Sequence, residues 1–106
     1  MTDPFKYYLP LSEAFVAAAQ MDMSVVVICE NERAKHNMRF EIRTMLSVQD
    51  YNFPRQQTGP FCFLHGRLRI VSPSNIPALY GLRFNWWTGE FDSRLRSWIL
   101  SSVVTP

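Results

Sequence analysis

The order of apolar and polar residues along the chain predicts alternating helices and strands. "SVVVIC" (24–29) is a continuous apolar run rich in β-branched residues, which predicts a strand buried on both faces, as in a parallel sheet covered by helices. On either side of it, apolar residues recur every three or four positions, which predicts two amphipathic helices. The first covers 12–21 with Ser12 as its N-cap, and the second begins after Asn31, which can cap it.

The second half of the chain begins with a predicted β-hairpin. "FCFL" and "RLRIVS" flank the dipeptide "HG", in which Gly66 is expected to take the positive φ of a tight turn. Residues of a strand alternate between its two faces. Leu68 and Ile70 should therefore point to one face, and Arg67 and Arg69 to the other.

The remaining elements complete an α/β order. The apolar patterns predict strands over 5–9 and 82–88, a loop over 47–59, a short helical turn within 74–81, and a last helix over 93–103 capped by Asp92. The order is typical of a small three-layer sandwich with a largely parallel sheet plus a β-hairpin. With 106 residues, the chain fits a single α/β domain, 1–106.

Composition narrows the class of protein. Hydrophobic residues make up 47% and aromatic residues 14% of the chain, enough for one packed core. A net charge of +2 is low for a protein whose default partner is nucleic acid. Cys29 and Cys62 lie in apolar runs, so we expect buried, reduced thiols and no zinc site. Without a signal sequence or an apolar run of about 20 residues, the sequence predicts a cytoplasmic protein that does not insert into a membrane.

Two long stretches resemble a known family. "KYYLPLSEAFVAAAQMDMSVVVICENERAKHNMRFEIRTML" is similar to the opening of the P-loop motor core of phage large terminases and related helicase-like ATPases. "HGRLRIVSPSNIPALYGLRFN" resembles the later segment that leads to the strand with paired acidic residues. The resemblance implies a P-loop-ATPase-like topology and a phage protein acting in the host cytoplasm.

The catalytic motifs of that family are incomplete. Ser12 matches the magnesium-binding hydroxyl, but Leu11 stands where the phosphate-binding Lys belongs, and the first glycine of the chain is Gly59. Glu90 matches the water-activating carboxylate, whereas Gly89 replaces the metal-binding Asp. We therefore expect a degenerate core with no phosphate loop, no independent ATPase activity, no catalytic residues, no metal and no cofactor.

Binding residues are predicted on two strands and on the last helix. Trp86 and Trp87 should point to opposite faces of their strand, so that at least one lies in the core. Exposed Trp and Arg are favoured anchors at protein interfaces. The complete set of candidates is Arg67, Arg69, Arg83, Trp86, Trp87, Arg94 and Arg96.

Three functions remain open for these residues. The favoured one is a non-catalytic interaction protein, encoded by a phage as the resemblance implies, which inhibits or modulates a protein partner such as a nucleic-acid machine. The first alternative is a nucleic-acid-binding module in which arginines and aromatic rings bind phosphates and bases. The second is a subunit that supplies Glu90 or an arginine to the ATPase site of another chain.

Overall fold

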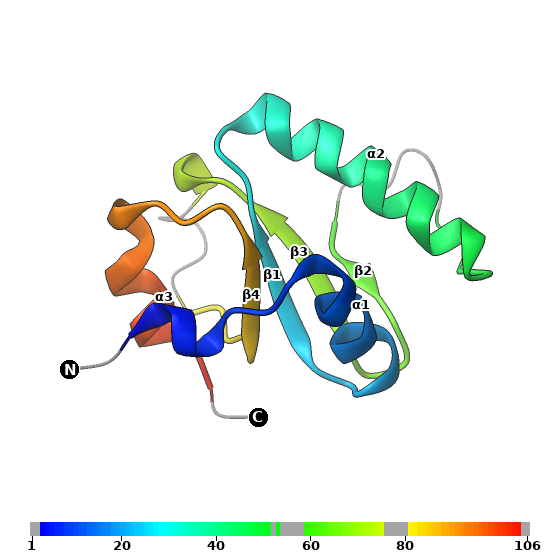
Figure 1. The fold of residues 1–106 in the computed structure, drawn as a ribbon, viewed down its shortest axis with the longest axis horizontal. Helices are drawn as coiled ribbons and strands as arrows, with labels where there is room; N and C mark the ends of the chain where they lie inside the picture. Colours follow the sequence, from blue (N-terminus) through cyan, green and yellow to red (C-terminus); the bar gives the residue numbers. More distant parts are fainter. Residues whose placement is uncertain (1–2, 52, 54–58, 76–80, 105–106) are drawn as a thin grey trace.

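The centre of the protein is a four-stranded open sheet with the order β2-β3-β1-β4 (Figure 1). The computed structural model describes residues 3–51, 53, 59–75 and 81–104. β1 (Ser24–Ile28) lies between β3 (Arg67–Val71) and β4 (Trp86–Gly89) and is parallel to both. β2 (Phe61–Cys62) pairs with β3 in the antiparallel sense. The expected parallel sheet with an added hairpin is confirmed.

Helices cover both faces of this sheet, so the described part of the chain has three layers (Figure 1). α1 (Leu11–Gln20) and α2 (Glu32–Val48) pack against Val25 and Val27 on one face. α3 (Arg96–Ser102) packs on the opposite face. Because β1 is buried on both sides by apolar residues, its unbroken β-branched sequence has the expected explanation.

The side chains of β3 alternate as predicted. Leu68 is paired with Val25 and lies in the core beneath α1 and α2. Arg69 is paired with Val26, whose side chain lies in the core beneath α3. Arg67 therefore shares the α3 face with Arg69, while Leu68 and Ile70 share the other face.

One predicted helix cap is confirmed and another is wrong. The Asn31 side chain accepts a hydrogen bond from the backbone N–H of Ala34 at 2.8 Å and begins α2. In α1 the cap is Pro10, which makes no side-chain hydrogen bond, and Ser12 lies inside the first turn. Because the helix already begins at Leu11, Ser12 is its second residue and its side chain is not at the capping position.

The predicted strand over 5–9 is also wrong. Pro4–Tyr7 forms a 3-10 helix, η1, because Asp3 accepts a hydrogen bond from the N–H of Phe5 and a proline occupies the first position. Only the end of this segment is extended, where Tyr8 forms an isolated parallel bridge with Trp87. The aromatic residues that suggested a strand instead pack against the edge of the sheet.

Two details of the second half differ from expectation. The hairpin forms, but the positive-φ glycines among the described residues are Gly81 and Gly89, not Gly66. Gly66 is required for space, since an added Cβ would lie 1.8 Å from the carbonyl oxygen of Ala18. The strand predicted over 82–88 is shorter, because Phe84 is bridged to Val103 before β4 begins at Trp86.

The remaining predictions concern the loops and the last helix. Asp92 accepts a hydrogen bond from the N–H of Arg94 and begins η3 (Ser93–Leu95), which leads into α3 as expected. The predicted loop over 47–59 begins later, because α2 extends to Val48. The middle of that loop and most of the helical turn predicted within 74–81 lie outside the described residues.

Candidate functional site

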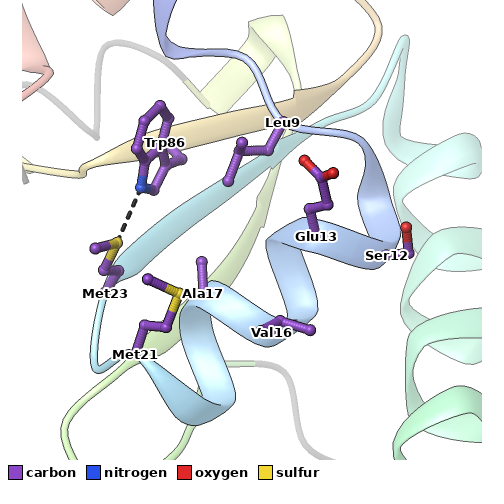
Figure 2. A pocket seen from close by; sticks show the side chains of 8 residues that line it. All are labelled: Leu9, Ser12, Glu13, Val16, Ala17, Met21, Met23 and Trp86. Carbon is purple, nitrogen blue, oxygen red and sulfur yellow. Dashed lines mark hydrogen bonds between the residues drawn. The ribbon is translucent and has the colours of Figure 1, made fainter.

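An apolar groove lies between α1 and the start of β4 (Figure 2). We call it the α1 groove, and its volume is about 450 Å³. The residues that line it are Leu9, Ser12, Glu13, Val16, Ala17, Met21, Met23 and Trp86. Six of these eight side chains are aliphatic, thioether or aromatic, so the groove can bind an apolar group but offers few polar contacts.

The chain reversal after α1 forms one end of this groove. α1 ends at Gln20 with Met21 as its C-cap, and Asp22 has a φ of 57°, a left-handed conformation that aspartate tolerates better than most residues. Met23 then leads into β1 and brings its thioether beside Trp86. The indole Nε1 of Trp86 donates a hydrogen bond to the Met23 Sδ at 2.9 Å, which fixes the ring at the wall of the groove (Figure 2).

Several lining side chains are open to solvent. Met21 is 55% exposed and Val16 is 45% exposed, while Trp86 is partly buried against the core beneath α1. Single exposed apolar residues are common, but a concave group of them marks a binding surface. The α1 groove therefore has the properties of a docking site for an apolar segment.

The two tryptophans of β4 do point to opposite faces. Trp87 is fully buried beneath α3, and its Nε1 donates a hydrogen bond to the carbonyl oxygen of Pro4 at 2.7 Å. Phe5, Tyr8 and Phe91 surround its ring, with centroids between 4.9 and 5.9 Å away. Trp87 is thus a core residue, and of the pair only Trp86 is placed to contact a ligand.

Three of the candidate arginines gather on the α3 face. Arg67, Arg69 and Arg83 line a hollow of about 40 Å³ together with the first residues of β1 and with Leu82 and Phe84. We call this feature the arginine hollow. Among the described residues, none of the three guanidinium groups has an ion-pair partner.

The other two candidate arginines lie elsewhere. Arg94 forms an ion pair with Asp92 at 2.6 Å, and its hydrogen bonds hold the pKa of that carboxyl below its usual range. Arg96 is exposed in the first turn of α3. Neither residue lines the arginine hollow, so the predicted set does not form one site.

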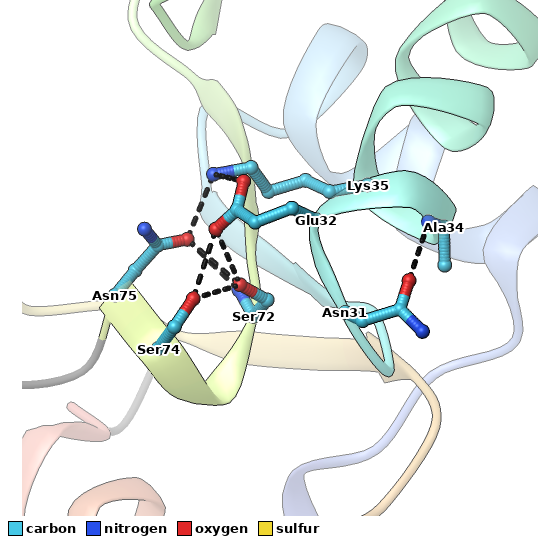
Figure 3. A network of polar contacts seen from close by, with 7 residues as sticks. All are labelled: Asn31, Glu32, Ala34, Lys35, Ser72, Ser74 and Asn75. Atoms are coloured by element: carbon cyan, nitrogen blue, oxygen red, sulfur yellow. Dashed lines mark hydrogen bonds and ion pairs between the residues drawn. The ribbon is translucent and has the colours of Figure 1, made fainter.

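Polar side chains meet at the carboxyl end of β3 (Figure 3). The Glu32 carboxylate accepts hydrogen bonds from the hydroxyls of Ser72 and Ser74 at 3.0 and 2.9 Å, and Lys35 forms an ion pair with it at 3.2 Å. These contacts lower the pKa of Glu32. Lys35 also donates to Asn75, so the network ties the start of α2 to the end of β3.

The two cysteines and the possible metal ligands do not form a reactive site among the described residues. Burial, followed by the charges of Glu90 and Glu41, raises the pKa of the Cys29 thiol to about 11, so it is protonated at neutral pH. Cys62, expected to be buried, is exposed because it lies in the short edge strand β2. No cluster of three or more His, Cys, Asp or Glu residues suited to a metal occurs within the described ranges.

Comparisons with known proteins give no assignment. No protein-family model matches the chain, and no characterised protein or solved structure matches it significantly. No helix in the described part of the chain is both long and apolar enough to cross a membrane.

Most of the α1 groove was not predicted from the sequence. Val16 lies on the side of α1 opposite to much of the predicted apolar stripe, and neither exposed Met21 nor partly buried Met23 fits a motif. The available signal was the pair of methionines beside the end of a helix, because Met is frequent at adaptable binding surfaces. Trp86 was a candidate on its own, but its partners are more than sixty residues away in the sequence.

Proposed function

We propose that this chain is a non-catalytic interaction domain that binds an apolar segment of a protein partner in the α1 groove. The observation that carries the proposal is the placement of Trp86, held by Met23 at the wall of a groove whose mouth exposes Met21 and Val16. Tryptophan is enriched among residues that dominate binding energy at protein interfaces.

The size of the groove suits a short segment of a partner. It follows α1 from Ser12 to Met21, a distance of roughly 14 Å at the helical rise of about 1.5 Å per residue. This length accommodates about two turns of a helix or four residues of an extended chain. Binding would remove the exposed parts of Val16 and Met21 from water, which favours association by about 25 cal/mol for each Å² of apolar surface.

The absence of catalysis is part of this proposal. Gly89 occupies the position where the terminase resemblance expects a metal-binding Asp, and its φ of 100° disfavours any other residue. A Cβ there would also lie 2.2 Å from the carbonyl oxygen of Ile28. These constraints support a degenerate core in which Glu90 has no metal-binding partner beside it.

A phage origin and a role as modulator of a nucleic-acid machine belong to the same proposal. They rest on the resemblance in the sequence alone, which is an argument by analogy. The binding role does not depend on them, because it follows from the apolar groove.

Peptide display tests the binding role directly. The immobilised protein should select peptides rich in large apolar residues from a random library, and Val16→Asp should abolish this selection by placing a charge in the groove. Val48→Asp is the matched control, since Val48 is 81% exposed at the end of α2 and lies outside the groove. Selection of the same peptides by Val16→Asp, or no apolar selection by the unmodified protein, would refute the proposal.

Hydrolysis is tested separately. Incubation with ATP and magnesium should release no phosphate above the rate of a protein-free sample. Turnover that disappears in Glu90→Gln would show that a working site exists.

A further inference from the structure

The arginine hollow carries charge that no acidic side chain in the described part of the chain pairs with. Arg67 and Arg69 are two residues apart on β3 and therefore share one face, with Cα atoms roughly 7 Å apart. Arg83 completes the hollow from the segment before β4, and both Arg67 and Arg83 are exposed. Guanidinium groups stay charged at any physiological pH and bind carboxylates through two parallel hydrogen bonds.

The hollow adjoins the α1 groove around the amino end of the sheet. Met23 lines the groove, and the next residue, Ser24, lines the hollow. Trp86 lines the groove, and Phe84, two residues earlier, lines the hollow. The two features lie on opposite faces of the sheet, so a chain that turns around this edge beside Met23 and Ser24 passes from one to the other.

We propose that the groove and the hollow bind one linear segment of a protein partner, in which apolar residues are followed by a short acidic stretch. The inference rests on the proposed function, to which it adds the charge and direction of the ligand. Apolar residues occupy the α1 groove, and Asp or Glu residues pair with Arg67, Arg69 and Arg83.

The position of the arginine hollow sets the direction of that segment. Glu13 lies near one end of the groove, while Met21 and Met23 lie at the other (Figure 2). Asp22 is exposed at the Met21 end, so Glu13 is not the only carboxylate near the groove. Because Ser24, the residue after Met23, lines the arginine hollow, the acidic stretch lies beyond Met23, where three guanidinium groups can pair with it. At the Glu13 end, the segment carries neutral or basic residues.

The lining of the hollow favours a peptide over nucleic acid. Binding of single strands combines basic residues with exposed aromatic rings on which bases stack. The described lining contains one aromatic residue, Phe84, and it is only 1% exposed. A small hollow with three arginines fits carboxylates, which need no stacking surface.

Peptide display also separates this inference from the proposed function. The unmodified protein should select peptides with an apolar block followed, at one end, by Asp and Glu. The triple variant Arg67→Gln, Arg69→Gln, Arg83→Gln should still select the apolar block without the acidic residues. Arg33→Gln, which removes an exposed charge from α2, is the control and should select both.

The contribution of the arginines to affinity is measured with a selected peptide that carries a fluorescent label, by fluorescence anisotropy. The triple variant should bind it about 10-fold more weakly, as expected for three partly exposed ion pairs, and with less dependence on salt. A matched peptide with Gln in place of its acidic residues should bind both proteins equally.

The outcomes are distinct. Apolar selection without acidic residues overturns this inference and leaves the proposed function standing, whereas loss of apolar selection overturns the proposed function. A single-stranded oligonucleotide that displaces the acidic peptide at physiological salt, and requires the same three arginines, would also overturn the inference by making the hollow a phosphate site.

Discussion

Truncation of the two adjacent tryptophans of β4 should have opposite effects. Trp87→Ala removes a fully buried ring and its hydrogen bond to Pro4. Trp86→Ala removes a partly buried ring from the wall of the α1 groove. We expect the first change to destabilise the fold and the second to weaken partner binding.

The loss of stability expected for Trp87→Ala follows from the burial of the Trp87 ring. A buried tryptophan removes about 200 Å² from water, which corresponds to about 5 kcal/mol at 25 cal/mol per Å². Measured costs of Trp→Ala in protein cores are about 3 to 5 kcal/mol. Since small domains have about 5 to 15 kcal/mol of total stability, the Trp87→Ala variant should be mostly unfolded or should melt about 12 °C or more below the unmodified protein.

Trp87→Phe keeps the experiment informative if the alanine variant does not fold. It retains a ring in the core but leaves the Pro4 carbonyl without its donor, at a cost of about 1 to 3 kcal/mol. Trp86→Ala should cost about 1 to 2 kcal/mol, because its ring is only partly removed from water.

Urea denaturation followed by far-ultraviolet circular dichroism measures these differences without relying on tryptophan emission. Binding of a display-selected peptide to Trp86→Ala completes the test. Equal destabilisation by both alanine variants would place both rings in the core. Full peptide binding by folded Trp86→Ala would remove Trp86 as the anchor of the groove.

Three further changes test the packing, the thiols and the polar network. Gly66→Ala should destabilise the protein by several kcal/mol through its clash with the α1 backbone, whereas Gly59→Ala, with open space around it, should be nearly neutral; similar melting temperatures would contradict the close approach. At pH 8, a thiol reagent should modify exposed Cys62 rapidly and Cys29 only on unfolding, as mass spectrometry of the labelled peptides can verify; equal rates would contradict its burial. Glu32→Gln should reduce stability at pH 7 but not at pH 2. A carboxyl whose folded-state pKa lies below the usual 4.5 stabilises the fold above that value, and this stabilisation is lost as the pH falls through the lowered pKa. An equal loss of stability at both pH values in urea titrations would refute this linkage.

Local chemistry explains which elements could be predicted. β1 was predictable because an apolar β-branched run has few alternatives to a buried strand, and α2 because Asn31 and the apolar repeat agree. The prediction of a strand over 5–9 was wrong because Asp3 and Pro4 favour a 3-10 helix, which outweighs the strand propensity of the aromatic residues. Gly66 was assigned to the correct turn for the wrong reason, since its contact with α1 joins residues far apart in the sequence.

In the candidate site, too, only features set by local geometry could be predicted from the sequence. Alternation along β3 predicted that Arg67 and Arg69 share a face, because strand geometry alone determines it. Sequence alone could not choose between Trp86 and Trp87, since the choice depends on which helices cover each face. The α1 groove depends on the position of one helix against a distant strand, which no local pattern specifies.

The distribution of polar groups explains why binding is expected at the amino end of the sheet. Open α/β sheets commonly bind ligands beyond the carboxyl ends of their strands. In this protein, the Glu32 carboxylate at that end is engaged by Ser72, Ser74 and Lys35, and Cys29 is buried and protonated. At the amino end, the exposed thioether of Met21 and the guanidinium groups of the arginine hollow have no such partners among the described residues. Unused apolar surface and unpaired charge are what an external ligand can satisfy, so this distribution agrees with the proposed binding at the amino end.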